Sequence, residues 1–367
     1  MSTGLKDTFF QLVRLGIGTS KDAIIPNGID WKALKALAEE QGLSAIVLDG
    51  LNEVRSKKSD VRSDWFPPQT MTLEWIGEVL QNYEGRYASY EKAIGELAGF
   101  YASHNIKMMV LKGYGLSLYY PKPNHRPCGD IDTWNFGKQQ EADELLTKEL
   151  GINVDASEHH HTVFYWKNYM VENHYDMLIT TAVKTNSQLE PLLKELAMDD
   201  SNSVVINGEK VYLPSANFNA LFLLRHMLMH FVACGINLRN ILDWAFFWEK
   251  DGEKVDTVWL KGIVEQYHMD AFFYIVNAIC VDDLGFASNV FPSVQFNPTL
   301  KERVLKDTLE PEYDWKDAHR LGFLKRIFFK YKRWKAGAWK RELCYGEGNW
   351  ASFWMSIWSH ILKPSSI

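Results

Sequence analysis

Residues 110–135 read VLKGYGLSLYYPKPNHRPCGDIDTWN, and a short apolar run lies at each end of this stretch. The first run ends at Lys112 and Gly113, which is typical of a buried strand that enters a turn. Residues 114–120 fit a short helix that the following proline ends, and residues 129–136 fit a second strand. The stretch therefore predicts a strand, a turn with a short helix, and a second strand in close succession.

More elements of both kinds follow directly. Residues 141–150 fit a helix that the next glycine ends. Residues 161–167 and 169–178 fit two strands joined by a turn. This mixture of short strands and helices predicts an α+β fold with a small mixed β-sheet, and we place this core at residues 106–213.

The two flanking regions, residues 1–105 and 214–367, are predicted to be helical. Apolar residues recur at helical spacing in residues 31–51, where a glycine breaks the pattern into a helix pair, and again in residues 71–104. Ser215 is a suitable N-cap for the apolar segment that follows it. We therefore expect an N-terminal helical region, the α+β core, and a C-terminal helical region.

The bulk composition limits the class of protein. The chain has 367 residues, of which 46% are hydrophobic, and this is ample for a buried core. Its formal net charge of −6 argues against a protein that coats nucleic acid over its whole surface, but it is compatible with a local basic patch. Four scattered cysteines predict reduced thiols and a cytoplasmic location. We expect neither a secretory signal nor a membrane span.

Asp130 and Asp132 are the first candidates for chemistry. Residues two apart on a strand point to the same face and lie roughly 6.6 Å apart along it. Two carboxylates at that distance repel each other by roughly 3 kcal/mol at an effective dielectric constant of 20. A cation relieves this repulsion, and Mg²⁺ commonly binds one or two carboxylates. The alternative is that both side chains lie on a solvated strand end or turn.

Residues upstream of this pair suit a phosphate group. Lys112 and Gly113 lie at the predicted junction of strand and turn, and Gly115 follows. Glycine lets backbone amides approach a phosphate closely, and lysine adds a compact positive charge. Arg126, four residues before Asp130, is a second candidate cation, and both cations would oppose the charge of the β and γ phosphates.

The same stretch resembles the LKG…YP…R…GDID signature of an uncharacterised nucleotidyltransferase family within the polymerase-beta-like superfamily. Members of the superfamily carry a third acidic residue on a later strand, and in this family that segment reads valine, glutamate, any residue, histidine, aromatic. Residues 171–175, VENHY, match it. The resemblance therefore implies that Glu172 is the third carboxylate and that His174 lies in the site. Asp176, on the same predicted strand face, is the alternative to Glu172.

The resemblance also implies a reaction. A nucleoside monophosphate would pass from ATP or another NTP to an unidentified acceptor (a small molecule, a protein or RNA), with release of pyrophosphate. Asp130 and Asp132 would hold two Mg²⁺ ions about 3.5–4 Å apart, and Glu172 would complete one metal site and accept the proton of the acceptor. The chain departs from the superfamily pattern at Tyr114, which replaces a small residue, and in a longer spacing before Asp130.

Two other functions compete with this one. The chain could be a catalytically silent nucleotide-binding or regulatory module. It could also be an RNA-binding protein that uses residues 319–341, a segment rich in cations and aromatic residues without an acidic residue.

Several histidines and charged residues have less certain roles. Residues 159–161 are three consecutive histidines, and we expect one of them to line the pocket rather than to bind zinc. His226 and His230 share one helix face; we expect a buried structural role, and contact with the nucleotide or the acceptor is the alternative. Arg239 and Asp243 have the spacing of an ion pair within a helix.

Overall fold

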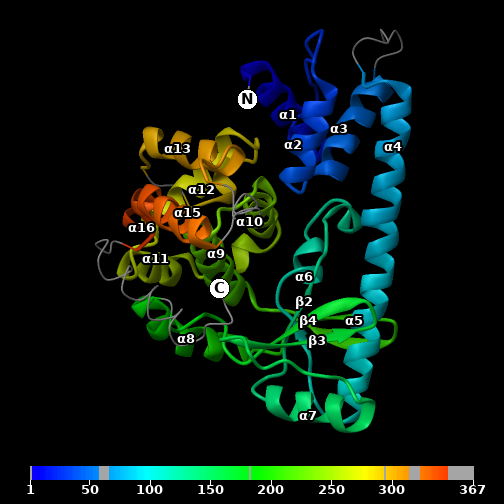
Figure 1. Ribbon diagram of the computed structural model, residues 1–367, viewed down its shortest axis with the longest axis vertical. Coiled ribbons are helices and arrows are strands. Elements are labelled where there is room, and N and C mark those ends of the chain that lie inside the picture. Colours follow the sequence, from blue (N-terminus) through cyan, green and yellow to red (C-terminus); the bar gives the residue numbers. More distant parts are fainter. Residues whose placement is uncertain (1, 58–65, 182, 293–294, 314–322, 346–367) are drawn as a thin grey trace.

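The computed structural model describes residues 2–57, 66–181, 183–292, 295–313 and 323–345, and helices surround a single six-stranded sheet in that part of the chain (Figure 1). The predicted α+β class with a small mixed sheet is confirmed. All six strands lie between residues 109 and 212, inside the predicted core.

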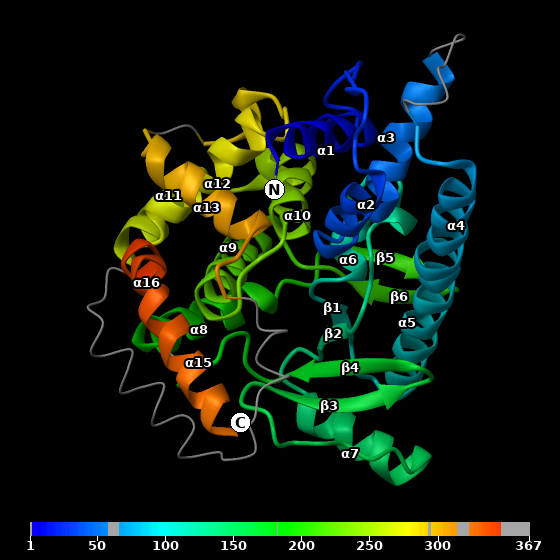
Figure 2. The same cartoon turned by 45° about the horizontal axis from the view of Figure 1, so that its top comes forward.

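The sheet has the strand order β3-β4-β2-β1-β6-β5. It is mixed because β2 runs parallel to β4 and β1 runs parallel to β6, whereas the other neighbouring pairs are antiparallel. Figure 2 shows the β3–β4 hairpin and the β5–β6 hairpin as separate parts of this sheet. The strands are β1 (Met109–Val110), β2 (Ile131–Trp134), β3 (His161–Trp166), β4 (Tyr169–His174), β5 (Ser203–Ile206) and β6 (Glu209–Tyr212).

The β5–β6 hairpin was missing from the sequence-based prediction. Its turn is Asn207-Gly208, and both residues have positive φ, 52° and 88°. An Asn-Gly pair between two runs with β-branched residues is a strong hairpin signal, so the sequence did contain the information. The hairpin matters because β6 pairs with β1 and so supports the strand that leads into the candidate site.

The N-terminal helices follow the prediction closely. Gly42, with φ +67°, separates α2 from α3 as expected. The predicted long helix over residues 71–104 is present as α4, a π-helical turn and α5, and it runs along the sheet (Figure 1). Ile94 and Leu97 of α5 share a buried cluster with Ile131 of β2. The elements are α1 (Thr3–Gly16), α2 (Trp31–Glu40), α3 (Ser44–Lys57), α4 (Gln69–Val79), η2 (Leu80–Gly85) and α5 (Arg86–Ser103).

Three short helices connect the strands of the core: α6 (Tyr114–Ser117), η3 (Pro123–His125) and α7 (Gln139–Leu150). The predicted helix stop after residue 150 is confirmed, because Gly151 has φ +64° and its backbone N–H caps α7. Pro121 follows α6 by a few residues, as predicted for a short helix. The core therefore has the expected order of strands and helices up to β4.

The C-terminal region is helical, and Ser215 caps α9 as predicted, with its side chain accepting a hydrogen bond from the N–H of Phe218. N-terminal residues such as Phe9 and C-terminal residues such as Phe246 belong to one buried cluster. The division at residues 105 and 213 stays a prediction. The elements are α8 (Lys184–Ala197), α9 (Ala216–Ala233), α10 (Leu238–Asp251), η4 (Gly252–Lys254), α11 (Thr257–Gln266), α12 (Asp270–Asp282), η5 (Ser288–Val290), α13 (Pro298–Leu309), α15 (Phe323–Ala336) and α16 (Ala338–Tyr345).

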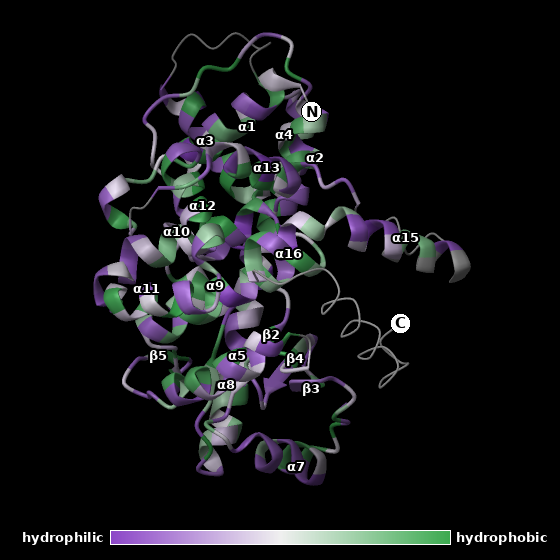
Figure 3. Cartoon of the chain, turned by 90° about the vertical axis from the view of Figure 1, so that its left-hand side faces the viewer, coloured by the Kyte–Doolittle hydropathy of each residue, from purple (hydrophilic) through white to green (hydrophobic). Residues whose placement is uncertain are grey.

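The helices carry hydrophilic and hydrophobic residues mixed along their length (Figure 3). Within the described residues, no helix combines the length and the apolar character that crossing a membrane requires. All four cysteines lie in described segments and are free thiols, as predicted. Residues 350–362, whose sequence fits a docking helix rather than a membrane anchor, lie outside the described residues.

Candidate active site

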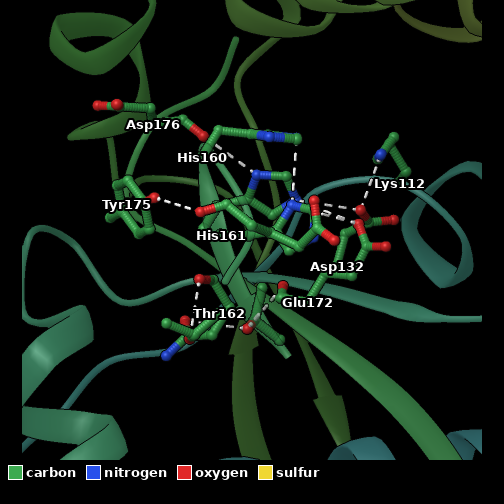
Figure 4. A network of polar contacts seen from close by, with 12 residues as sticks. Lys112, Asp132, His160, His161, Thr162, Glu172, Tyr175 and Asp176 are labelled. Carbon is green, nitrogen blue, oxygen red and sulfur yellow. Dashed lines mark hydrogen bonds and ion pairs between the residues drawn. The ribbon is translucent and has the colours of Figure 1, made fainter. Parts of the chain in front are cut away.

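Asp132 and Glu172 form the centre of the candidate site. They are direct partners in the register of the parallel pair β2–β4, so both side chains project from the same face of the sheet. Asp132 is buried, and the Glu172 side chain is 18% exposed. Figure 4 shows the two carboxylates side by side. The sheet therefore brings together a carboxylate of the predicted Asp-x-Asp motif and the glutamate that the family resemblance implied.

Lys112 lies against these carboxylates from the bend that follows β1, the neighbour of β2. Its Nζ is 2.7 Å from Oδ1 of Asp132 and 3.2 Å from Nε2 of His226. The chain can turn away directly after Lys112 because Gly113 adopts φ +47°, a conformation that favours glycine. The predicted junction of strand and turn thus places a buried ammonium group in the centre of the site.

Histidines cover the same face of the sheet. His174 Nε2 lies 3.2 Å from Oδ1 of Asp132, and its Nδ1 lies 3.1 Å from the backbone oxygen of Asp176. His161 is the register partner of His174 across β3 and β4, and His160 lies beside it. We expected one of the three consecutive histidines to line the pocket. Two of them, His160 and His161, line it in the structure.

The two central carboxylates have opposite pKa shifts. Burial alone would raise the pKa of Asp132, but the charge of Lys112 and the hydrogen bond to His174 hold it well below its usual range. Burial and the neighbouring charge of Asp132 raise the pKa of Glu172 to about 8. At neutral pH, the pair Asp132 and Glu172 therefore contains one ionised carboxylate and one that holds a proton.

The basic groups of the site are also shifted. Burial lowers the pKa of Lys112, but Asp132 more than offsets this effect, so the net pKa is raised and the ammonium keeps its charge. Burial and nearby positive charge lower the pKa of His160 to about 3, of His161 to about 4 and of His230 to about 4. These three rings are consequently neutral at pH 7 and can offer a lone pair.

Asp130 lies at the edge of this group. The strand begins at Ile131, so Asp130 occupies the bend before β2 rather than the strand itself, and its backbone oxygen accepts a 2.5 Å hydrogen bond from the hydroxyl of Tyr90. Asp130 lines the cavity, and its charge contributes to the raised pKa of Glu172. Among the described residues, two carboxylates and one imidazole lie close enough together to hold a metal ion, and they belong to Asp132, Glu172 and His174.

Arg126 has a different role from the one predicted. Its guanidinium donates two hydrogen bonds to Asp243 of α10, at 2.8 and 2.9 Å, and the pair is buried. The hydroxyl of Tyr120 donates a third hydrogen bond to Asp243. The predicted pairing of Asp243 with Arg239 inside α10 is therefore wrong. Arg126 lines the cavity, but its guanidinium is bonded to Asp243. This ion pair connects the loop before β2 to the C-terminal helices.

The remaining candidate site residues, Asp176, Gly113 and Gly115, differ in whether they belong to the site. Asp176 pairs with Lys194 and points away from Asp132 and Glu172 in Figure 4, which supports Glu172 as the third carboxylate. Gly113 lines the cavity, whereas Gly115 lies inside α6 and packs against the backbone oxygen of Val110. The expected phosphate contact is therefore supported for Gly113 and not for Gly115.

These groups lie in a cavity of about 940 Å³ between the sheet and the C-terminal helices. Its other walls come from α9, α10, α15 and α16, and they include residues that sequence reasoning did not assign to the site. The basic aromatic segment at residues 319–341 was considered for RNA binding. Its described part contributes Arg333, Trp334 and Arg341 to the wall of this cavity. The added wall residues with charge or an aromatic ring are His226, His230, Arg239, Trp244, Arg333, Trp334, Arg341 and Tyr345.

The chain is similar to known proteins in two comparisons. The model of a family described as "Uncharacterised nucleotidyltransferase" matches residues 27–284, a range that includes the six strands of the described residues and the central carboxylates. A crystal structure of an antigenic nucleotidyltransferase-like protein from Paracoccidioides brasiliensis is similar to 43% of this chain and 75% of its own, with 18% sequence identity and a TM-score of 0.32. No curated protein matches the chain.

Proposed function

Because the chain belongs to the uncharacterised nucleotidyltransferase family, we propose that it transfers a nucleoside monophosphate from an NTP to an acceptor and releases pyrophosphate. The observation that carries this proposal is the pairing of Asp132 with Glu172 on the floor of the cavity. Both carboxylates face a space large enough for a nucleotide, and a lysine lies between them and the helical wall.

The donor set fits a divalent cation. Burial, together with the neighbouring charge of Asp132, raises the pKa of Glu172 to about 8, and a dication in the same place would stabilise the ionised carboxylate. Asp132 and Glu172 would hold the ion, with Asp130 reaching it from the bend before β2. Mg²⁺ bound there would neutralise phosphate charge and polarise the phosphorus centre for in-line attack.

The protein groups around this position have defined tasks. Lys112 stays charged and would oppose the negative charge of the triphosphate, and Gly113, in the turn that follows it, lines the same cavity. Glu172, ionised when the metal binds, would lie beside the attacking hydroxyl group and accept its proton. Asp132 stays ionised and fixes Lys112 and His174.

The cavity suits a substrate of this kind. Its volume of about 940 Å³ is near the upper end of ligand pockets, which suits a nucleotide together with part of an acceptor. Arg239, Arg333 and Arg341 supply positive charge on the helical wall opposite the carboxylates. A triphosphate between the two sides would meet cations on one side and metal-binding carboxylates on the other. We propose a cytoplasmic reaction because the four thiols are free.

The test is an incubation of the purified chain with each α-labelled NTP, Mg²⁺ and a cell extract. We expect label to transfer to an acceptor, Asp132→Asn to abolish the transfer, and Glu141→Gln, which changes an exposed carboxylate of α7, to leave it intact. Transfer that survives Asp132→Asn would refute the site. Nucleotide binding without transfer would support the silent module, and salt-sensitive RNA binding unaffected by Asp132→Asn would support the RNA-binding alternative.

A further inference from the structure

Three imidazole rings converge beside the two carboxylates, from β3, β4 and the residue before β3. His161 and His174 are register partners, with ring centroids 5.2 Å apart, and the centroid of His160 is 4.3 Å from that of His161. One ligand atom from each of the three histidines lies within 4.8 Å of the others. His174 belongs both to this trio and to the group formed with Asp132 and Glu172. The rings and the carboxylates are therefore one continuous donor set.

The orientation of His174 is fixed by its outer nitrogen. Nδ1 lies 3.1 Å from the backbone oxygen of Asp176, which can only accept a hydrogen bond, so Nδ1 carries the proton. Nε2 then points at Oδ1 of Asp132, 3.2 Å away, and either a proton or a metal ion between these two atoms satisfies the contact. Donation of the outer N–H to a backbone carbonyl is also the usual arrangement of a metal-bound histidine.

The spacing of the donor atoms agrees with one shared ion. Metal–ligand bonds of 2.0–2.1 Å in a tetrahedral site separate the ligand atoms by about 3.3 Å. His160 Nε2 and His161 Nδ1 are 3.1 Å apart. Oε2 of Glu172 lies 3.8 Å from His161 Nδ1 and 3.8 Å from His174 Nε2. Movements of a few tenths of an ångström would bring these atoms to the spacing of metal ligands.

The chemistry of the donors selects the ion. Mg²⁺ takes oxygen ligands and requires near-octahedral geometry, so imidazole nitrogens add little to its binding. Imidazole suits first-row transition metals such as Mn²⁺, Fe²⁺, Co²⁺ and Zn²⁺, and mixed histidine and carboxylate sites are typical of them.

We infer that this strand face binds a divalent transition-metal ion through the three imidazoles, with the carboxylates of Asp132 and Glu172 completing its coordination. The inference builds on the proposed function, because it names the metal class of the same site. It differs from the expectation of an all-oxygen magnesium centre, since nitrogen ligands from β3 and β4 contribute as much as the carboxylates do.

Metal binding to the untagged, metal-free full chain tests this inference. The affinity for Co²⁺ is followed by the visible absorption that develops on coordination, and the affinity for Mg²⁺ by calorimetry. We expect His161→Gln and His160→Gln each to weaken Co²⁺ binding by about 10–100-fold while changing Mg²⁺ binding less than about threefold. His159→Gln is the matched control, because His159 belongs to the same histidine run but to neither potential ligand group of the described residues.

Equal Co²⁺ affinity in His161→Gln, His160→Gln and His159→Gln would overturn the inference, provided that circular dichroism shows each variant folded. The comparison with Mg²⁺ is needed because most sites bind Co²⁺ more tightly whatever their ligands. Histidine-dependent Co²⁺ binding without nucleotidyl transfer would uphold this inference and count against the proposed reaction. Transfer with Mg²⁺ that is indifferent to both histidine variants would do the reverse.

Discussion

Lys112 Nζ lies 2.7 Å from Oδ1 of Asp132, and both side chains are largely removed from solvent, at 17% and 3% exposure. The lysine lies in the bend after β1 and the aspartate on β2, so the contact depends on the antiparallel pairing of these strands. A buried charge that loses its partner is costly, whereas a divalent ion can take the place of an ammonium group beside carboxylates. This pair therefore links the stability of the core to the occupancy of the site.

We expect Lys112→Met to lower the free energy of unfolding by about 3 kcal/mol in metal-free buffer, because Asp132 loses its buried counter-charge. Mn²⁺ should recover most of that loss and should stabilise the variant more than it stabilises the original chain. Denaturant unfolding with and without Mn²⁺ measures both effects. Lys107→Met, which removes an exposed lysine paired with Asp200, is the control and should change stability by less than about 1 kcal/mol. An equal loss in both variants would contradict the prediction.

The Glu172 carboxyl should contribute a loss of stability to the metal-free protein as pH rises from about 5 to 8, whereas the histidines with lowered pKa values contribute the opposite change below about pH 6.5. Glu172 has a folded-state pKa of about 8 against an ordinary value of 4.5, so the folded state binds more protons than the unfolded state in this window. Glu172→Gln should remove this dependence and raise the unfolding free energy at pH 8 by on the order of 1–3 kcal/mol. Denaturant unfolding at pH 5 and pH 8 tests the effect. If the variant is no more stable than the original chain at pH 8, ionisation of the buried Glu172 carboxyl does not reduce the stability of the protein.

Metal affinity should rise with pH over the same range. A metal ion must displace the proton of Glu172, so binding of Mn²⁺ should strengthen by up to about tenfold per pH unit below pH 8 and level off above it. Calorimetric titrations from pH 6 to pH 9 measure the slope and the accompanying proton release. In Glu172→Gln, both the slope and the proton release should shrink. A flat profile in the original chain would rule out displacement of this proton.

Arg126→Ala should destabilise the fold by about 3–5 kcal/mol, because it leaves the buried carboxylate of Asp243 without its guanidinium. Lys138→Ala breaks an exposed pair with Glu141, and there we expect a change below about 1 kcal/mol. Thermal and denaturant unfolding compare the two. If Arg126 instead serves mainly as a phosphate ligand, Arg126→Ala will weaken nucleotide binding and leave stability nearly unchanged.

Gly50→Ala should destabilise the N-terminal helices by about 2 kcal/mol or more, because a Cβ at Gly50 would lie 2.1 Å from the backbone oxygen of Leu12. The helices α1 and α3 must separate to admit it. Gly77→Ala is the matched change on exposed α4, where a Cβ meets nothing within 4 Å, and it should stabilise by about 0.5–1 kcal/mol. Changes of opposite sign in the unfolding free energies of the two variants would confirm the close contact between α1 and α3. An unchanged unfolding free energy in Gly50→Ala would refute it.

Local sequence patterns were sufficient to predict most of the helices and strands. The turn at Gly113, the helix break at Gly42 and the cap at Ser215 each depend on backbone conformations or hydrogen bonds within a few residues. The family signature also identified Asp132 and Glu172, which β2 and β4 then place side by side. These features are predictable because the forces behind them act between residues that are close in the chain.

The partners of the charged groups were decided by the tertiary structure. Asp243 was assigned to Arg239 four residues away, yet it binds Arg126, which is 117 residues distant, because packing places the loop before β2 against α10. In the same way, Lys112 meets Asp132 and His161 meets His174 only through strand pairing. Spacing along one helix makes an ion pair geometrically available, but burial decides which pair forms, since a desolvated charge gains most from the partner that is buried with it.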